Sequence, residues 1–247
     1  MSFPGKILNA IEGTEEQHDT VANKRYPYGT IMELADGRRY RYAHVHASYA
    51  LPRGRPVLSS DDASEKGAFL GAVTLGSNTF TWTSVEAIAA DQFADGYILM
   101  QGGFVKKVKS NTATSGAASS TIVIYGTHTD ATWASGRYAW MIENPYANVI
   151  SRGQVGATPG KVVGVSLLDA TADYCCWIQT KGLCGVISSN SGLGNADAES
   201  QLVACGSAGD EVILAAAYGR QIIGHVAGYN VVNWDNENFI MADLCIE

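Results

Sequence analysis

Two histidines separated by one residue are the side chains best spaced for metal chemistry in this sequence. His44 and His46 form the pattern His-Val-His. Residues i and i+2 of a strand share a face, so both imidazoles could reach one metal ion. A zinc site needs three or four ligands, and only Glu33, across a neighbouring turn, offers a third by position. We therefore expect this pair on a solvated or interface face and predict no metal site.

A second candidate for ion binding is the segment NWDNENF, which runs from Asn233 to Phe239. Its carboxylates and amide carbonyls are oxygen ligands of the kind that calcium prefers. The segment lacks the EF-hand pattern D-x-[DN]-x-[DN]-G, which sets the spacing of such ligands around the ion. It is predicted to be a polar turn between two strands.

Thiol chemistry could come from five cysteines, namely Cys175, Cys176, Cys184, Cys205 and Cys245. None belongs to a Cys-x-x-Cys pair and the number is odd, so neither a redox motif nor a disulfide framework is indicated. The spacing of these residues does not suggest a zinc site either. The sequence opens without a secretory signal pattern, and reduced, partly buried thiols are therefore expected.

Signatures of common enzymes are missing from the sequence. There is no G-x-S-x-G, H-E-x-x-H or phosphate-binding G-x-x-x-x-G-K-[ST], and the GLGNAD segment at Gly192 lacks the strand and helix of a dinucleotide site. Tryptophan in strands is more often a core or interface residue than a sugar platform. We predict no catalytic and no cofactor-binding residue, and a protein that is not an enzyme.

The stretch MELADGRRYRY, residues 32–42, alternates arginine and tyrosine after the turn signal Asp36-Gly37. On a strand, Arg39 and Arg41 share one face and the two intervening tyrosines share the other. The ADGR segment suits a two-residue type I′ hairpin turn. We expect the tyrosines to pack on the body or on a sister subunit. The arginines are expected to face carboxylates of a neighbouring protein, since guanidinium pairs well with them.

Along the rest of the chain, short apolar segments predicted to be strands alternate with glycine-containing turns about every ten residues. This pattern is typical of sandwiches and barrels. DYCCWIQTKGLCGVISS, residues 173–189, is predicted to be a hairpin that turns at Thr180-Lys181-Gly182. Lys106, Lys107 and Lys109 are predicted to protect an edge strand. One helix is expected near 84–94, because apolar residues recur there at helical spacing and Ser84 could cap it.

The predicted fold class is therefore all-β, with several short-stranded antiparallel β domains of the sandwich or barrel type, an N-terminal arm and one short helix. The predicted division is an arm over 1–27, a β-rich region over 28–150 that includes the helix, and a C-terminal β domain over 151–247. The arm is polar and proline-containing, and such segments are often ordered by a neighbour.

Composition points towards contacts with other proteins. Charged residues make up 17% of the 247 residues, which is below the usual quarter and indicates a surface used for protein contacts. The formal net charge of −7 argues against nucleic acid as a partner, because a binder of nucleic acid needs a basic face. No stretch is long and apolar enough to span a membrane, so no membrane partner is expected.

The segment YPYGTIMELADGRRYRYAHVHASYALPRGRPV resembles a group of small tailed-phage virion proteins that are encoded near the major capsid gene. Three further segments are similar to the same group, namely ADGYILMQGGFVKKVKSN, YAWMIENPYANVI and the YCCWIQTKG stretch within VVGVSLLDATADYCCWIQTKGLCGVI. The pair Cys175-Cys176 and the long arm depart from the pattern, which leaves the exact family open.

This resemblance implies a capsid decoration or cement protein, made in the host cytoplasm and located on the outer capsid surface of the virion. It implies the major capsid protein and sister copies, in a homotrimer, as partners. The residues predicted for the interface are Arg39, Arg41, Tyr40, Tyr42, Tyr26 and Tyr28.

Two alternatives stay open at the level of the sequence. One is a head fibre, spike or tail-associated module that binds a carbohydrate or a host surface, which exposed tryptophan clusters would favour. The other is an enzyme such as a depolymerase, which paired carboxylates in a cleft would favour.

Overall fold

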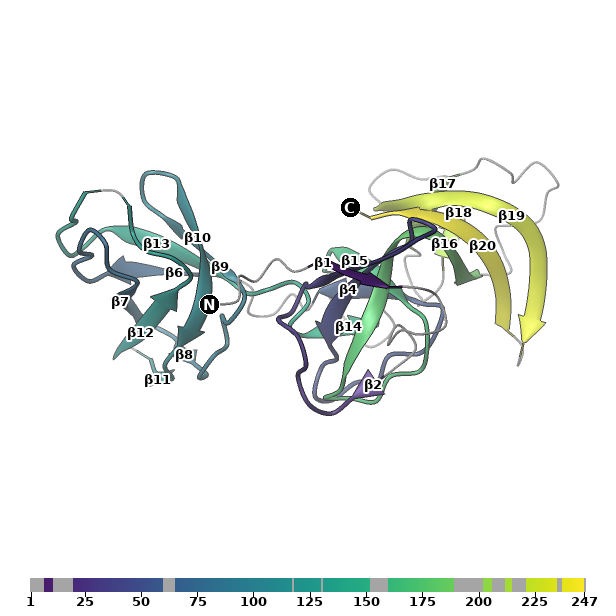
Figure 1. Ribbon diagram of the computed structural model, residues 1–247. Coiled ribbons are helices and arrows are strands. Elements are labelled where there is room, and N and C mark those ends of the chain that lie inside the picture. The colour runs from purple at the N-terminus through teal and green to yellow at the C-terminus, as the bar shows by residue number, and fades with distance from the viewer. Residues whose placement is uncertain are drawn as a thin grey trace. The chain divides into compact units, whose positions relative to one another are not determined.

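The computed structural model describes residues 7–10, 20–59, 65–116, 118–129, 131–151, 160–188, 202–205, 212–214, 221–234 and 237–246. In these ranges the regular secondary structure consists of strands alone, labelled β1–β20 (Figure 1). No helix in these ranges is long and apolar enough to cross a bilayer. Antiparallel pairing prevails and six strands close into a barrel, so the prediction of an all-β chain of the sandwich or barrel type is confirmed.

The chain forms two units, each with its own core. Unit 1 comprises Met1–Pro4 and Asp62–Pro145, and unit 2 comprises Gly5–Asp61 and Tyr146–Glu247. The predicted boundary between residues 150 and 151 lies inside β14 (Val149–Ser151), because β14 pairs with β5 (Pro56–Ser59) of the same unit. A pairing between strands so far apart in the chain leaves no mark on the local sequence pattern.

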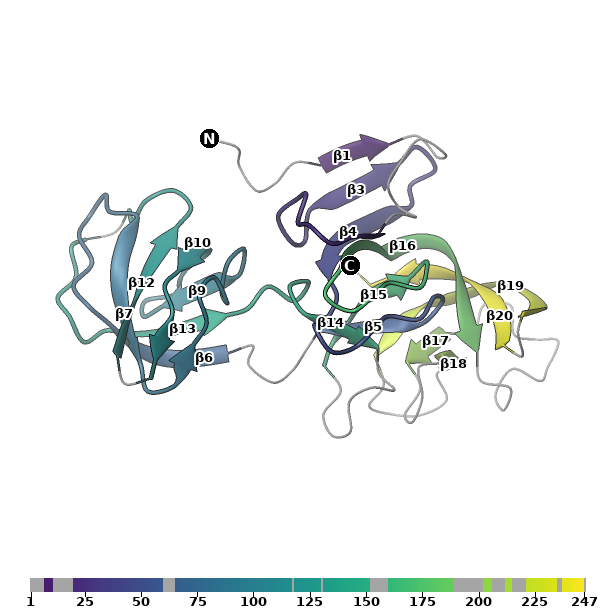
Figure 2. The same ribbon diagram turned by 90° about the horizontal axis from the view of Figure 1, so that it is seen from below.

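Unit 1 is a closed barrel with the strand order β10-β12-β7-β6-β13-β9 (Figure 2). Its strands are β6 (Glu65–Leu70), β7 (Thr79–Ser84), β9 (Tyr97–Met100), β10 (Phe104–Asn111), β12 (Ala118–Ile124) and β13 (Tyr138–Ile142). Two short strands, β8 (Ala87–Ile88) and β11 (Thr114–Ser115), pair beside it. β10 pairs with both β9 and β12. The prediction that its lysines protect an edge strand is therefore wrong, since a closed barrel has no edge.

Side chains alternate between the inside and the outside of this barrel. In β7, Phe80 and Trp82 are buried while Thr79, Thr81 and Thr83 are exposed. The barrel interior is filled by such inward residues, and a fully buried large side chain of this kind contributes about 1.5–3 kcal/mol relative to an exposed one. The period-2 pattern that predicted strands here is thus the pattern of core packing.

The helix predicted near 84–94 is absent, and this is a correction to the sequence-based expectation. The segment contains β8 and turns, with Asp91 at a φ of 58°. The Ser84 hydroxyl accepts a hydrogen bond from the amide of Glu86 at 3.1 Å, which makes a local turn instead of a helix cap. Ile88 and Phe93 are both buried in the barrel core, so their spacing reflects packing of an irregular segment.

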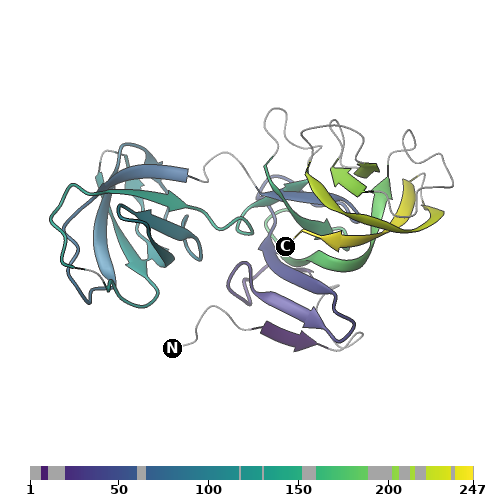
Figure 3. The same ribbon diagram turned by 90° about the horizontal axis from the view of Figure 1, so that it is seen from above.

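Unit 2 is built on one large sheet, with the path β1-β3-β4-β16-β18-β17-β19-β20 and side branches through β2, β5, β14 and β15. The strands not yet bounded are β1 (Ile7–Ala10), β2 (Thr20–Val21), β3 (Ile31–Leu34), β4 (Arg39–His44), β15 (Val162–Ser166), β16 (Cys175–Ser188), β17 (Leu202–Cys205), β18 (Val212–Leu214), β19 (Ile222–Trp234) and β20 (Glu237–Cys245). β19 and β20 form a long curved ribbon (Figure 3). Register shifts beside Gly228 explain the curvature, because bulges bend a strand.

Two parts of the predicted arm are paired with this sheet. β1 lies parallel to β3, with Ile7 opposite Ile31, and it forms the outer strand of this part of the sheet (Figure 2). β2 lies antiparallel to the start of β16, with Thr20 opposite Cys176. The remaining residues between 1 and 19 lie outside the described ranges.

The hairpin predicted at Thr180-Lys181-Gly182 is also corrected, because β16 is one continuous strand of 14 residues. A bulge between Gln179 and Lys181 bends it. The Gln179 Nε2 lies within hydrogen-bond distance of the carbonyl oxygens of Lys181, Gly182 and Leu183, at 3.0, 3.2 and 2.8 Å. Gly182 has a φ of 83°, which is characteristic of glycine in turns and bulges. The turn signal in the sequence therefore marks a bend.

The predicted turn at Asp36-Gly37 is present but has a different type. The Gly37 amide donates to the Leu34 carbonyl at 3.0 Å, and the Leu34 amide donates to the Arg38 carbonyl at 2.9 Å. Only Gly37 has a positive φ, of 87°. This is a three-residue loop with glycine in the left-handed position, not the predicted two-residue type I′ turn.

Unit 1 is inserted into unit 2 between two neighbouring strands. Ser59 at the end of β5 pairs with Val149 at the start of β14. Within the barrel, the first residue of β6 pairs with the last residue of β13, Glu65 with Ile142. The two ends of the inserted unit therefore meet, and so do the two strand ends that receive it, which is the geometry that domain insertion requires.

We expect the fragment Asp62–Pro145 to fold alone, because every strand of the closed barrel lies within it. The measurement is thermal unfolding followed by circular dichroism, with a cooperative transition and a near-ultraviolet signal from buried Trp82 as the expected result. The matched chain, with residues 62–145 replaced by a short glycine turn, should keep unit 2 folded. A fragment that melts without cooperativity would contradict independent folding.

A pair of glycine substitutions in β16 tests the bend. At Gly182 the positive φ disfavours alanine, and a Cβ would also lie 2.9 Å from the Arg38 Cγ; we expect Gly182→Ala to lower the free energy of unfolding by about 1–2 kcal/mol. Gly185 has only the Phe239 ring edge at 4.0 Å, so Gly185→Ala should be neutral or slightly stabilising. Urea unfolding of the unit 2 transition measures both, and equal effects would show that the bend is not strained.

Candidate functional site

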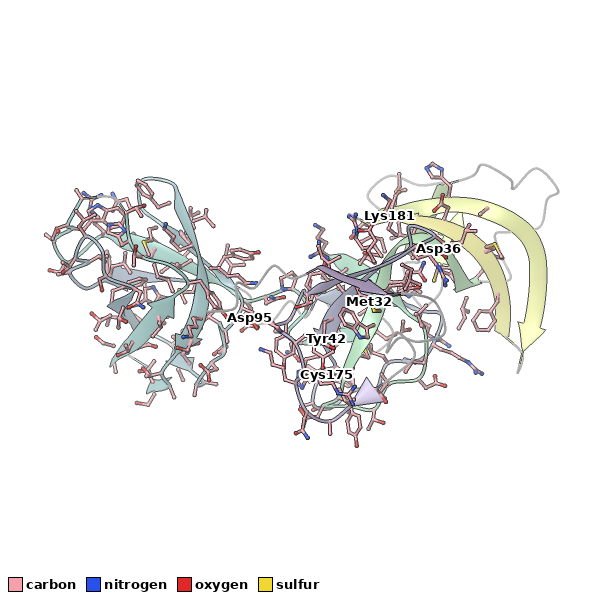
Figure 4. All side chains as sticks on the ribbon, viewed as in Figure 1. Met32, Asp36, Tyr42, Asp95, Cys175 and Lys181 are labelled. Atoms are coloured by element: carbon pink, nitrogen blue, oxygen red, sulfur yellow. The ribbon has the colours of Figure 1, made fainter. Side chains whose placement is uncertain are left out.

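The four tyrosines predicted for the interface pack inside unit 2. Tyr40 and Tyr42 are buried beside Trp177, and Tyr42 lies in this cluster near labelled Met32 and Cys175 (Figure 4). The ring of Tyr26 meets that of Tyr42 edge-on at 5.3 Å, and the ring of Tyr28 stacks on it at 6.5 Å. Tyr40 and Tyr42 were expected to pack either on their own chain or on a sister subunit. The structure shows that they pack in the core of their own unit.

The two predicted arginines make contacts within their own chain. The Arg39 Nη2 lies 3.2 Å from the Glu33 Oε2 on the facing strand. The Arg41 Nη1 donates to the Gly29 carbonyl at 2.9 Å, and its guanidinium lies 5.7 Å from the ring of Tyr146. Both side chains remain partly exposed, so a partner could reach them, and their interface role stays a prediction.

The histidine pair does not converge on a shared position. The ring nitrogens of His44 lie 3.0 Å from the Ala147 carbonyl oxygen and 3.2 Å from the Asp173 carboxylate. The Nδ1 of His46 accepts a hydrogen bond from the Ser48 amide at 3.0 Å. In the part of the chain that the structure describes, no three His, Cys, Asp or Glu residues are grouped to hold a metal.

Cys175 lies opposite His44 in the β4–β16 pairing, with Asp173 close to that histidine. Cysteine, histidine and aspartate together suit nucleophilic catalysis when the imidazole is free to take the thiol proton. Here both nitrogens of His44 are already engaged, and burial raises the pKa of the Cys175 thiol. The trio is therefore set for packing and not for attack on a substrate.

Three of the described thiols are buried. Cys175, Cys176 and Cys184 are free and buried, while Cys245 is free and exposed. Burial raises the pKa of Cys176 and of Cys184 to about 12 in each case. Since the thiolate is the reactive form, these two residues are chemically inert near neutral pH.

A contiguous group of exposed apolar side chains covers part of the outer surface of the barrel. Trp140, Tyr138, Phe69 and Leu99 are 43%, 37%, 57% and 37% exposed, which is unusual for large apolar residues of one β domain. We call the full group the outer aromatic face. Its members are Phe69, Tyr97, Leu99, Val105, Tyr138 and Trp140.

Strand pairing brings the members of the outer aromatic face together from four neighbouring strands. Tyr138 of β13 lies opposite Phe69 of β6, and Trp140 lies opposite Leu99 of β9. Leu99 in turn lies opposite Val105 of β10. Directly opposed residues of antiparallel strands point to the same side, so these side chains form one surface.

Gly67 of β6 positions the centre of this face. It pairs with Trp140, and a Cβ at this position would collide with the Tyr138 hydroxyl. The Tyr138 ring therefore lies across the glycine. Tyr138 also meets Phe69 and Trp140 with ring centroids 5.4 and 5.6 Å apart, both edge to face. Such pairs are favourable beyond the apolar area that they bury.

The neighbouring outer surface has a different chemistry. β7 presents Thr79, Thr81 and Thr83, and the facing strand β12 presents Ser119 and Thr121. The hydroxyls of Thr83 and Ser119 lie 2.8 Å apart. The outer aromatic face thus borders on strands β7 and β12, whose outward side chains carry mainly hydroxyl groups.

This face was not found by sequence reasoning. In YAWMI, residues 138–142, the outward residues Tyr138 and Trp140 alternate with buried Ala139 and Met141. Both sets are apolar, so the alternation signals a strand without showing which set faces solvent. Of the tryptophans, Trp82, Trp133 and Trp177 are buried, as expected of core residues, and the Trp234 side chain lies outside the described residues.

Comparison of the chain with protein-family models, with curated proteins and with solved structures found no match in any of the three.

The buried thiols predict a selective labelling pattern. At about pH 8, where an ordinary thiol reacts readily, iodoacetamide should modify Cys245 quickly and leave Cys175, Cys176 and Cys184 unmodified, because the last three are buried. Peptide mass spectrometry measures each site. In concentrated urea all four should react at similar rates, and fast labelling of Cys176 in the folded chain would contradict its burial.

Proposed function

We propose that this chain is a structural virion protein, a decoration or cement protein that binds the outside of an icosahedral phage capsid and stabilises it. The observation that carries the proposal is the insertion of one separately cored β unit into another. A chain with two such units can contact a lattice at two places. Linked contacts raise the effective concentration of the second contact to about the millimolar range when the linkers are short.

Stabilisation follows from mass action. A protein that binds the assembled lattice and not its free subunits shifts the equilibrium towards the lattice, by about 2.7 kcal/mol per site at a free concentration of 100 times the Kd. Repetition over many equivalent sites makes modest affinities sufficient. The sequence resemblance to small virion proteins encoded near the major capsid gene supports this role.

The negative net charge of the chain supports the proposed location on the outer capsid surface. The formal net charge is −7, and packaged DNA attracts basic surfaces and repels acidic ones. An acidic protein is therefore better placed on the outside of a shell than against its contents. The proposed partners are the major capsid protein and sister copies of this chain in a homotrimer.

One observation favours a second candidate function, namely a head fibre, spike or tail-associated module that binds a carbohydrate or a host surface. Trp140 is 43% exposed and lies beside the exposed ring of Tyr138. Exposed aromatic rings are common contacts in binding sites. A glycan array distinguishes this candidate, because specific binding to a sugar is expected only if the second function is the true one.

The main test uses capsids of the virus that encodes this chain, prepared without it. We expect added protein to bind with saturable, symmetry-related stoichiometry and to raise the melting temperature of the capsids, because it binds only the assembled lattice. Mass measurement in solution should give three times the 26.2 kDa chain. Failure to bind these capsids would overturn the proposed function. A mass equal to that of one chain would overturn only the proposed homotrimer.

A further inference from the structure

We propose that the outer aromatic face of the barrel is a protein-docking surface for a partner that is apolar at its centre and acidic along one edge. This inference rests on the proposed function, under which the partner is the outer surface of the capsid lattice. It concerns residues outside the β3–β4 hairpin, in which four of the six interface residues predicted from the sequence lie.

The composition of the face is that of a protein interface. Tyrosine, tryptophan and phenylalanine are enriched at the centres of such interfaces, and truncation of a central Trp or Tyr often removes a large share of the binding energy. Trp140 lies between Gly67 on one side and Leu99 on the other, which is the central place in the face. It is therefore the expected anchor.

The face is also held in one conformation before any partner arrives. The ring of Tyr138 lies across Gly67. The backbone amide of Tyr138 donates a hydrogen bond to the Gln101 Oε1 at 3.3 Å. Contacts with Phe69 and Trp140 fix the ring from both sides. Side chains that are already ordered lose less conformational entropy on binding, so more of the contact energy remains as affinity.

Geometry favours a protein over a sugar at this face. The rings of Tyr138 and Trp140 are inclined by 73°, and those of Phe69 and Tyr138 by 83°, so they do not form the flat row on which sugar rings could stack. Leu99 and Val105 flank them with aliphatic groups only. A buried sugar hydroxyl beside these groups would lack a hydrogen-bond partner, which is unfavourable.

Positive charge borders the face along β10. Lys107 lies opposite Tyr97 and therefore points to the same side, and Lys109 further along the strand is exposed. Charges at the rim of an interface mainly steer association and set its salt dependence. A partner with carboxylates along this edge would complement the exposed Lys109, and we therefore expect the partner to be acidic there.

The experiment measures binding of the full chain to capsids by sedimentation, with Trp140→Ala compared with Val85→Ala. Val85 is 83% exposed in the same unit but lies outside the face, so its truncation is the matched control. We expect Trp140→Ala to weaken binding by more than about tenfold, as is common for a central aromatic residue, and Val85→Ala to bind like the wild type. Thermal unfolding of each variant reports whether the barrel stays folded.

A second variant keeps the test informative if Trp140→Ala proves unstable. Lys109→Glu reverses an exposed charge at the rim, and we expect slower association and a weaker dependence of that rate on salt. Folded Trp140→Ala that binds capsids like the wild type overturns this inference and leaves the proposed function intact. Wild-type protein that binds no capsid overturns the proposed function itself. Glycan binding that Trp140→Ala abolishes would identify the face as a sugar site and overturn its assignment to a protein.

Discussion

The larger unit depends on the bend in strand β16. Residues Cys175–Gln179 pair with β4, and Lys181–Ser188 pair with β20, so one strand belongs to two regions of the sheet. The change of partner coincides with the bulge between Gln179 and Lys181, and bulges bend a strand. The Gln179 side chain bonds to the carbonyls beyond the bulge, and Gly182 adopts the left-handed backbone there. Through this bend, β16 holds both the β3–β4 hairpin and the β19–β20 ribbon.

Two of the segments singled out in the sequence build this framework. MELADGRRYRY contributes most of β3 and β4. The YCCWIQTKG stretch contributes Trp177 to the core and Gln179 and Gly182 to the bend. Tyr40 and Tyr42 pack against Trp177 in the same cluster. These motifs therefore specify architecture. Recognition, in our proposal, belongs to the barrel, mainly to residues of the segments ADGYILMQGGFVKKVKSN and YAWMIENPYANVI.

Barrel closure explains why recognition there must use side chains. A closed sheet offers no unpaired backbone edge, so a partner cannot bind by adding a strand. What remains is the outward half of each strand, and only the side formed by β6, β13, β9 and β10 carries large apolar residues there among the described positions. Insertion through two adjacent strand ends lets unit 1 keep its own core while it is covalently held by unit 2.

The sequence by itself determined the all-β class, the position of the Asp36-Gly37 turn and the inward–outward alternation of strands such as β7, because these depend on neighbouring residues and on the two-residue period of a strand. Tertiary structure decided the rest. Whether Thr180-Lys181-Gly182 turns a hairpin or bends one strand depends on pairing with β4 and β20. Whether Tyr138 or Ala139 faces solvent depends on which side of β13 closes over the core. The insertion depends on β14 returning to β5, and such long-range pairings are set by the packing of the whole unit and not by any local pattern.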